Sequence, residues 1–238
     1  MKECEIILQN ALSEGRSSLL LTEAQQICKL HNIPTPESGL AKNAEEVEKV
    51  GSRIGFPIAL KIVSTQILHK SDVGGVILNI NSETALIESY KRMMAQVSKN
   101  KPEAQVLGVL VGKMMPASTE VIVGGIRDSQ FGPSVMFGMG GIFAEVYEDV
   151  AFRVAPIDKI DAVNLINEIK GSKILKGFRG EAAADIEGIV EILLNVSALM
   201  LEHESISQLD LNPVIAYSDS VCAVDFRIIM NRAKEGSI

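Results

Sequence analysis

The sequence predicts an α/β (α+β) protein of two lobes, and three observations support this prediction. The chain has 238 residues, enough for two small lobes that each bury a core. Hydrophobic residues make up 47% and aromatic residues only 4%, a balance typical of cores built from Val, Ile, Leu and Met. Segments with helical periodicity alternate with short strand-like runs, and the pattern changes at residues 113–116. We therefore expect one lobe over residues 1–111 and a second over residues 112–238.

The first lobe is expected to alternate helices with strands. Thr22 is a suitable N-cap for a helix that ends near Pro34, and Val47, Val50 and Ile54 mark a second helix. Strands are expected at residues 58–63, 76–80 and 106–111, with a helix around residues 85–94 before the last of them. Because the run 106–111 is almost entirely apolar, we expect that strand to be central in its sheet.

The second lobe is expected to begin with two strands, at residues 120–125 and 134–137. The glycine-rich residues 138–141 follow and predict a loop whose backbone can approach a ligand closely. Helices are expected at residues 162–170 and 186–202. A hairpin of strands 209–216 and 221–228 then closes the lobe.

Charge and the N-terminal residues limit the partners and the compartment. The formal net charge at pH 7 is −7, and no run of Lys or Arg forms a basic stripe, so we expect no nucleic-acid partner. Lys2, Glu3 and Glu5 leave no apolar region for a secretion signal. The apolar segment 186–201 is interrupted by Glu187 and Glu191 and predicts a buried helix. We therefore expect a cytoplasmic protein with no membrane partner.

The cysteines and histidines are not spaced as metal ligands usually are. No two of the three cysteines form a CxxC pair, and three are too few for a disulfide framework. We expect Cys28 and Cys222 to be small core residues in a reducing compartment. The three histidines show no spacing suited to zinc: His31, His69 and His203.

Lys61, which lies within an apolar strand-like run, is the most informative residue of the first lobe. Burying an ammonium without a partner is costly, so we expect Lys61 to point at an anion, with phosphate as the candidate. A polar loop with His69 follows, and Gly74 and Gly75 open the next strand. The alternatives are a lysine on the outer face of an amphipathic strand and a histidine that is simply a surface residue.

The closing hairpin predicts a geometry for its polar residues. If it turns at residues 218–219, Asn212 lies opposite Asp225 and Asp210 lies opposite Arg227. Directly opposed side chains are about 4.5–5.5 Å apart at Cβ, close enough for two oxygen donors to share Mg²⁺. The alternatives are an Asn-Pro pair that begins a turn and an Asp that caps a loop, and a register shift of one residue would separate the donors.

Two common nucleotide-binding motifs are missing. The chain has no GxxxxGK[ST] loop. Gly138 and Gly140 match the first two glycines of the dinucleotide-binding motif GxGxxG, but Phe143 stands at the position of the third. If this chain binds a nucleotide, it does so by another architecture.

Several longer motifs resemble one family over essentially the whole chain. They are residues 60–64 (LKIVS), 68–75 (LHKSDVGG), 131–133 (FGP), 136–141 (MFGMGG), 149–156 (DVAFRVAP) and 210–213 (DLNP), followed by Asp225. Together they resemble an ATP-grasp fold and, more narrowly, the β subunit of ADP-forming (NDP-forming) acetyl-CoA or acyl-CoA synthetases. The resemblance implies two lobes with a nucleotide between them.

The resemblance also implies an activity, a cofactor and a partner. The enzyme would be an acid–thiol ligase, an ADP-forming acetate–CoA ligase, that converts acyl-CoA, ADP and phosphate reversibly into acid, CoA and ATP. A CoA-binding α subunit would carry its own active-site histidine and pass a phosphoryl group to this chain through phosphohistidine. Nothing in the sequence resembles a CoA-binding Rossmann unit. We therefore expect this chain to be the nucleotide-binding half of an α2β2 heterotetramer.

The resemblance assigns roles residue by residue. His69 would carry the phosphoryl group, Asp210 would orient its ring, and Asn212 with Asp225 would hold Mg²⁺. The residues implied to bind ADP or ATP are Lys61, Val63, Val109, Leu110, Val111 and Glu120. A less specific match assigns the floor of the phosphoryl site to Gly140, Gly141 and Arg153.

Two other hypotheses are a stand-alone ATP-grasp ligase and a nucleotide-sensing module without turnover. A ligase needs its own pocket for a second substrate, for which 238 residues leave little room. A sensor has no need to combine His69 and Lys61 with Asn212 and Asp225, so the combination favours catalysis.

Overall fold

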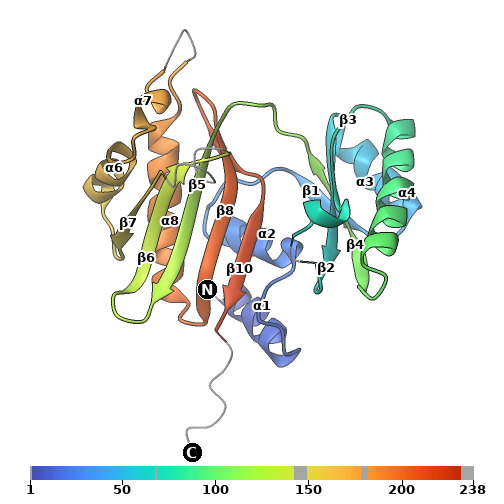
Figure 1. Cartoon of the computed structure of the whole chain (residues 1–238), viewed down its shortest axis with the longest axis horizontal. Helices are drawn as coiled ribbons and strands as arrows, with labels where there is room; N and C mark the ends of the chain where they lie inside the picture. The colour runs from blue at the N-terminus through green and yellow to red at the C-terminus, as the bar shows by residue number, and fades with distance from the viewer. Residues whose placement is uncertain (1, 68, 142–148, 178–181, 232–238) are drawn as a thin grey trace, which may run out of the picture. The chain divides into compact units, whose positions relative to one another are not determined.

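The computed structural model describes residues 2–67, 69–141, 149–177 and 182–231, and confirms the expected α/β (α+β) class (Figure 1). Contacts between residues divide the chain into two compact units. Unit 1 consists of Met1–Leu19, Glu23–Thr35 and Ala117–Ile238, and unit 2 consists of Leu20–Thr22 and Pro36–Pro116. The expected division after residue 111 differs from this one, because most of the first 35 residues belong with the C-terminal half.

Backbone hydrogen bonds explain why the N-terminal segment belongs to unit 1. Leu19 N donates to Ile228 O over 3.0 Å, and Met230 N donates to Ser17 O over 2.8 Å. Helix α1 (Lys2–Ser13), which was not among the expected elements, buries one face of the helix through Cys4, Leu8 and Ala11. The N-terminal residues therefore form part of unit 1, joined by hydrogen bonds to its C-terminal strand.

Unit 2 is a four-stranded antiparallel sheet with the strand order β1-β4-β2-β3. Its elements are β1 (Ser38–Ala41), α3 (Ala44–Ile54), β2 (Ile58–Ser64), η1 (Ser71–Val73), β3 (Val76–Ile80), α4 (Glu83–Asn100) and β4 (Val106–Lys113). The two helices lie on one side of the sheet (Figure 1) and share its core, to which Leu60, Ile62 and Leu86 belong. β4 lies between β1 and β2, which confirms the prediction of a central strand.

Side-chain caps fix where both helices of unit 2 begin. The Asn43 side chain accepts a hydrogen bond from Glu46 N, and the Ser82 side chain accepts one from Ala85 N. Each cap satisfies a backbone N–H that has no partner within its helix. The helices therefore start directly after β1 and β3, which keeps both connections short.

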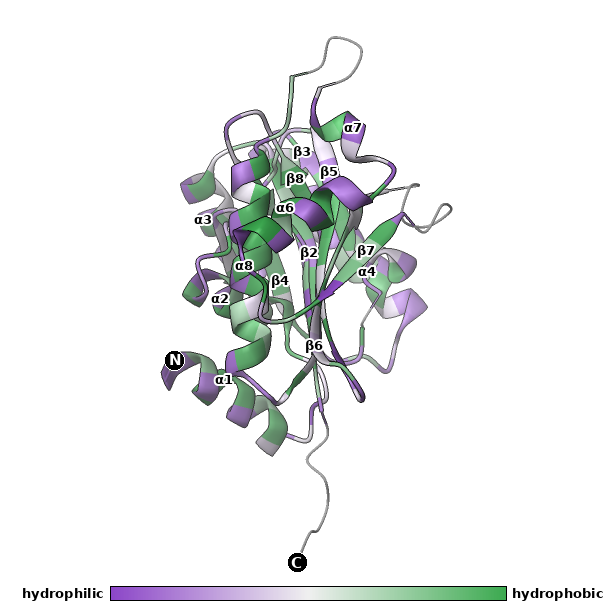
Figure 2. Cartoon of the chain, turned by 90° about the vertical axis from the view of Figure 1, so that its left-hand side faces the viewer, coloured by the Kyte–Doolittle hydropathy of each residue, from purple (hydrophilic) through white to green (hydrophobic). Residues whose placement is uncertain are grey.

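Unit 1 is a six-stranded antiparallel sheet with helices on one face. The strand order is β10-β8-β5-β6-β7, and β9 pairs with β8. Besides α1, its elements are α2 (Leu21–Leu30), β5 (Thr119–Asp128), β6 (Gly132–Met139), β7 (Val150–Val154), α6 (Lys159–Glu168), α7 (Ser172–Leu175), α8 (Ile186–Glu202), β8 (Ile206–Ala216), β9 (Val221–Ala223) and β10 (Phe226–Met230). Figure 2 shows α6 and α8 on the same side of this sheet.

Close packing explains a glycine in the middle of β5. Helix α8 packs against β5 and β6, and a Cβ added at Gly125 would lie only 2.6 Å from Met200 Cγ of that helix. Alternate residues of β5 therefore face α8, and the residues between them, including Gly124, face the opposite side of the sheet.

The register of the closing hairpin agrees with the prediction. Asp210 lies opposite Arg227, and Val214 lies opposite Ala223. Two residues separate β9 from β10, and the register against β8 is the same before and after this gap. Asn212 therefore lies opposite Asp225. The gap was not predicted, because the sequence favoured one continuous strand over residues 221–228.

Within the described ranges, no helix is both long enough and apolar enough to cross a membrane.

Candidate functional site

The face of the unit 1 sheet that points away from α8 carries the expected polar residues of the hairpin. A row of directly opposed residues crosses this face: Phe152, Met136, Gly124, Asp210 and Arg227. All five line a pocket of about 350 Å³. Asp210 is half-buried there, and its cross-strand neighbour supplies a positive charge. This pocket therefore places a carboxylate opposite a guanidinium, beside apolar side chains such as Met136 and Phe152.

Asn212 and Asp225 continue the same face by one step along the hairpin. Asn212 shares the side of Asp210 because side chains alternate along a strand. The pairing of β5 with β8 shifts between Val121 and Val123, which gives β8 one extra residue at this point. Such a bulge changes the direction of side chains and often lies beside an active site.

The two side chains fit the requirements of Mg²⁺. Asn212 is exposed, whereas Oδ1 of Asp225 is buried. Mg²⁺ binds oxygen ligands and usually keeps several waters while one or two protein groups hold it. An exposed amide oxygen opposite a partly buried carboxylate matches that coordination.

A larger pocket of about 840 Å³ lies at one end of the same sheet, lined in part by Glu120, Gly140 and Gly141. Gly140 N donates to Glu120 O over 2.8 Å, and a Cβ at Gly140 would lie 2.9 Å from Glu120 Cβ. Glu120 itself is exposed. The volume falls within the range of small-molecule sites, and backbone groups without side chains line one part of the wall.

The expected glycine-rich loop is shorter than predicted. Gly138 and Met139 complete β6, where they pair with Ile122 and Val121. Only Gly140 and Gly141 lie beyond the strand, and Gly141 has φ +61°, which favours glycine. The prediction of a loop over residues 138–141 was therefore wrong for its first half.

Asp149 supports one wall of this pocket without lining it, a role that was not predicted. Its buried carboxylate accepts hydrogen bonds from Lys170 N and Gly171 N, each over 2.7 Å. These bonds hold the turn before α7, which supplies Ile174 to the pocket wall. A single acidic residue before a strand carries no sequence signal for such a role.

Arg153 does not lie with the other residues expected at the phosphoryl site. It pairs with Val135, which in turn lies opposite Gly125 on the side of α8. Its Nη2 lies 2.7 Å from Oε2 of Glu168 in α6. The position of Arg153 therefore gives no support to the expected role at the floor of that site.

In unit 2, the face of the sheet away from α3 and α4 carries Lys61. Lys61 is half-buried and lies opposite Val76 on β3 and Leu110 on β4. Val63 shares this face by alternation. Lys61, Val63 and Leu110 are therefore brought together, as expected of residues that line one site.

Val109 and Val111 belong to the opposite face. Both are completely buried in the core with the helices. Their main-chain segment pairs with β1 on one edge and with β2 on the other. The structure therefore gives no support to the expected role of Val109 and Val111 in binding ADP or ATP, because the sheet already pairs their backbone groups.

The segment that follows β2 holds His69 in an exposed position. Gly74 ends η1 with φ +75°, Gly75 N donates to Lys70 O over 2.7 Å, and Ile62 N donates to Gly75 O over 2.8 Å. Gly74 and Gly75 therefore bring the end of this segment back to β2. The next residue, Val76, lies opposite Lys61. This explains why two glycines follow the histidine.

Gly75→Ala tests this closure. The added Cβ would lie 2.4 Å from Ile62 Cγ2 and 2.9 Å from Lys70 O, and a main-chain oxygen cannot easily move away. We expect the free energy of unfolding to fall by roughly 1–3 kcal/mol in chemical denaturation. Gly112→Ala in the same sheet is the control, because its nearest neighbour would be 3.6 Å away. Equal stability of both variants would contradict the proposed packing.

The fold and the site agree with one class of protein. The ATP-grasp domain family matches residues 10–230. The β subunit of ADP-forming acetate–CoA ligase I from Pyrococcus furiosus is 48% identical over 94% of this chain and 96% of its own length.

Solved structures are equally similar. Acetyl-coenzyme A synthetase 1 of Ca. Korarchaeum cryptofilum, in complex with coenzyme A and Ca-AMPCP, superposes with a TM-score of 0.93 at 46% identity, covering 94% of this chain and 98% of that one. A second structure of that enzyme contains Mg-AMPPCP and a phosphohistidine segment that points towards the nucleotide-binding site; its TM-score is 0.85 at 41% identity, with coverages of 96% and 100%. The chain belongs to the ATP-grasp family and, within it, to the β subunits of ADP-forming acetate–CoA ligases.

Proposed function

We propose that this chain is the nucleotide-binding subunit of an ADP-forming acyl-CoA synthetase, which converts acyl-CoA, ADP and phosphate reversibly into acid, CoA and ATP. The observation that carries the proposal is the set of Asp210, Asn212 and Asp225 on one open face of the unit 1 sheet. This set occurs in a chain 48% identical to an acetate–CoA ligase β subunit. Acetyl-CoA is the substrate that we propose to test first.

Lys61 is proposed to bind the phosphates of the nucleotide. A half-buried ammonium in a sheet face lined by Val63 and Leu110 gives a strong charge interaction, because little water competes for it. Mg²⁺ held by Asn212 and Asp225 would neutralise charge on the phosphate oxygens. Positioning and charge neutralisation are the main catalytic needs of phosphoryl transfer.

His69 is proposed to carry the phosphoryl group. A ring nitrogen forms an N–P bond as the N–P bond of an incoming phosphohistidine breaks, and a β-phosphate oxygen of ADP then takes the group from His69 as ATP forms. Dividing the transfer into two steps shortens the distance that each step must cover. The exposed position of His69 supports this role, and Asp210 is a carboxylate suited to orient a histidine ring through its N–H.

The function is tested by mixing the full chain with a CoA-binding α subunit and measuring ATP formed from acetyl-CoA, ADP and phosphate. We expect ATP formation only when both chains are present. Turnover by this chain alone would favour a stand-alone ligase. Nucleotide binding without ATP formation, both by this chain alone and by the two chains together, would favour a sensing module. That result, or turnover by this chain alone, would overturn the proposal.

Assembly gives a separate prediction. The relative from Pyrococcus furiosus is named as a β subunit, and we propose that this chain likewise forms a stable complex with an α subunit, as an α2β2 heterotetramer. Closed twofold assemblies are the commonest oligomers. Co-expressed chains should elute as one species whose mass by light scattering equals two copies of each. Separate elution of the two chains, or a fully active monomer of this chain, would contradict it.

A further inference from the structure

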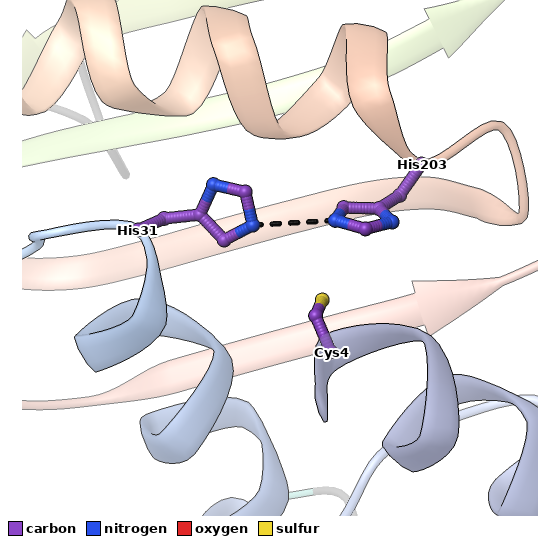
Figure 3. Close-up of side chains that lie close together, drawn as sticks. All are labelled: Cys4, His31 and His203. Carbon is purple, nitrogen blue, oxygen red and sulfur yellow. Dashed lines mark hydrogen bonds between the residues drawn. The ribbon is translucent and has the colours of Figure 1, made fainter. Parts of the chain in front are cut away.

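Three potential metal ligands that are far apart in the sequence meet within unit 1. Cys4 lies on α1, His31 directly follows α2, and His203 is the C-cap of α8. One ligand atom from each of these residues lies within 4.8 Å of the other two. Figure 3 shows the two imidazole rings approaching each other with the Cys4 sulfur beside them.

The spacing of the nitrogens suits a tetrahedral ion. Nε2 of His31 lies 3.2 Å from Nε2 of His203. Two nitrogens bound to one tetrahedral Zn²⁺ at 2.0–2.1 Å are about 3.3 Å apart, and a nitrogen and a thiolate sulfur are about 3.6 Å apart. The rings meet edge to face, with an interplanar angle of 84°. The Nε2 atoms are therefore at the separation that two ligands of one tetrahedral ion require.

Burial and charge favour an ion at this place. Cys4 and His203 are buried, and Oε2 of Glu5 lies 3.6 Å from Nδ1 of His203. A carboxylate near the second nitrogen of a histidine ligand is a common feature of zinc sites. At 3.6 Å this carboxylate makes no hydrogen bond, and the buried Nδ1 of His203 has no hydrogen-bond partner among the described residues.

We propose that Cys4, His31 and His203 bind one Zn²⁺ ion, which connects α1 to the C-terminal ends of α2 and α8. The Cys4 thiol loses its proton to solvent as the S–Zn bond forms, both imidazoles bind through Nε2, and water completes the tetrahedron. The three ligands are distinct from the residues proposed for the synthetase reaction.

Co²⁺ is the most direct probe, because a thiolate bound to tetrahedral Co²⁺ gives absorption bands that Zn²⁺ lacks. The full chain is stripped with a chelator, kept in excess Mg²⁺ to occupy hard-cation sites, and titrated with Co²⁺ and then Zn²⁺. We expect a thiolate-to-Co²⁺ charge-transfer band that saturates at one equivalent and disappears on addition of Zn²⁺. A thermal unfolding midpoint that rises with Zn²⁺ is expected as well, because the ion binds the folded chain.

Variants identify the ligands. We expect Cys4→Ser to remove the charge-transfer band and His31→Asn to weaken Zn²⁺ binding on the order of 100-fold or more. Cys222→Ser is the matched control, since that buried cysteine lies outside the cluster. His31 is only half-buried, so its variant tests the site even where a change at Cys4 disturbs folding.

The alternative is a hydrogen bond between the two rings, with the proton of one Nε2 shared over 3.2 Å. In that case Co²⁺ produces no charge-transfer band in the wild-type chain. An absent band, or equal Zn²⁺ affinity in the wild type and His31→Asn, overturns the proposal. ATP formation is measured separately, so either result leaves the proposed function untouched.

Discussion

His69→Asn should abolish ATP formation from acetyl-CoA, ADP and phosphate in the complex with an α subunit, by roughly three orders of magnitude or more. Asn can keep a hydrogen bond to a phosphate oxygen, but its amide nitrogen cannot accept a phosphoryl group. The side chain is exposed, so the substitution removes no core packing. We therefore expect nucleotide affinity and assembly with the α subunit to stay within a factor of about two of the wild type.

The measurement combines a rate with a chemical signature. The complex is incubated with acetyl-CoA and labelled phosphate, quenched in alkali, and the acid-labile phosphate on this chain is counted. The wild type should carry label and His69→Asn should not. Lys91→Asn, an exposed position on α4, is the control and should behave as the wild type does. Turnover of His69→Asn near the wild-type rate would show that His69 only assists the transfer.

Local patterns were sufficient for most of the regular elements. The strand 76–80 and the helix 186–202 were predicted to the residue. The apolar run of the strand and the apolar face of the helix each end at polar or turn-forming residues, which mark the boundaries of the element. β1 and β7 were missed. They are short, and neighbouring strands rather than their own residue pattern stabilise them.

The placement of the first 35 residues could not be derived locally. It depends on hydrogen bonds such as Leu19 N to Ile228 O, between segments at opposite ends of the chain. Residue periodicity describes one element at a time and carries no information about such a pairing. For the same reason, no spacing rule relates Cys4 and His31 to His203, which lies 172 residues after His31.

The site shows the same limit. Alternation and a hairpin register predicted that Asp210 and Asn212 share a face and that Arg227 lies opposite Asp210, and the register is as expected. Arg153 was assigned by likeness of a motif, without an argument for its face, and the pairing of β7 with β6 puts it on the side of α8. Face and register therefore need to accompany any role inferred from a motif.

Asp225→Ala should weaken the binding of Mg-ADP at least tenfold, a loss of about 1.4 kcal/mol. The proposed Mg²⁺ site has a single carboxylate, and without it the opposed Asn212 offers only a neutral oxygen to the ion. Binding of ADP in the absence of Mg²⁺ should change much less, because Lys61 acts on the phosphates directly. The difference between the two affinities therefore isolates the contribution of the metal.

Calorimetric titration of each variant with ADP, with and without Mg²⁺, measures both affinities. Glu204→Ala is the matched control, because it also removes one carboxylate from unit 1 but at an exposed position before β8. The control should keep the wild-type response to Mg²⁺, so a general effect of lost negative charge is separated from loss of a ligand. If Asp225→Ala binds Mg-ADP as tightly as Glu204→Ala does, the ion is held elsewhere, and the facing positions of Asn212 and Asp225 serve only the hairpin.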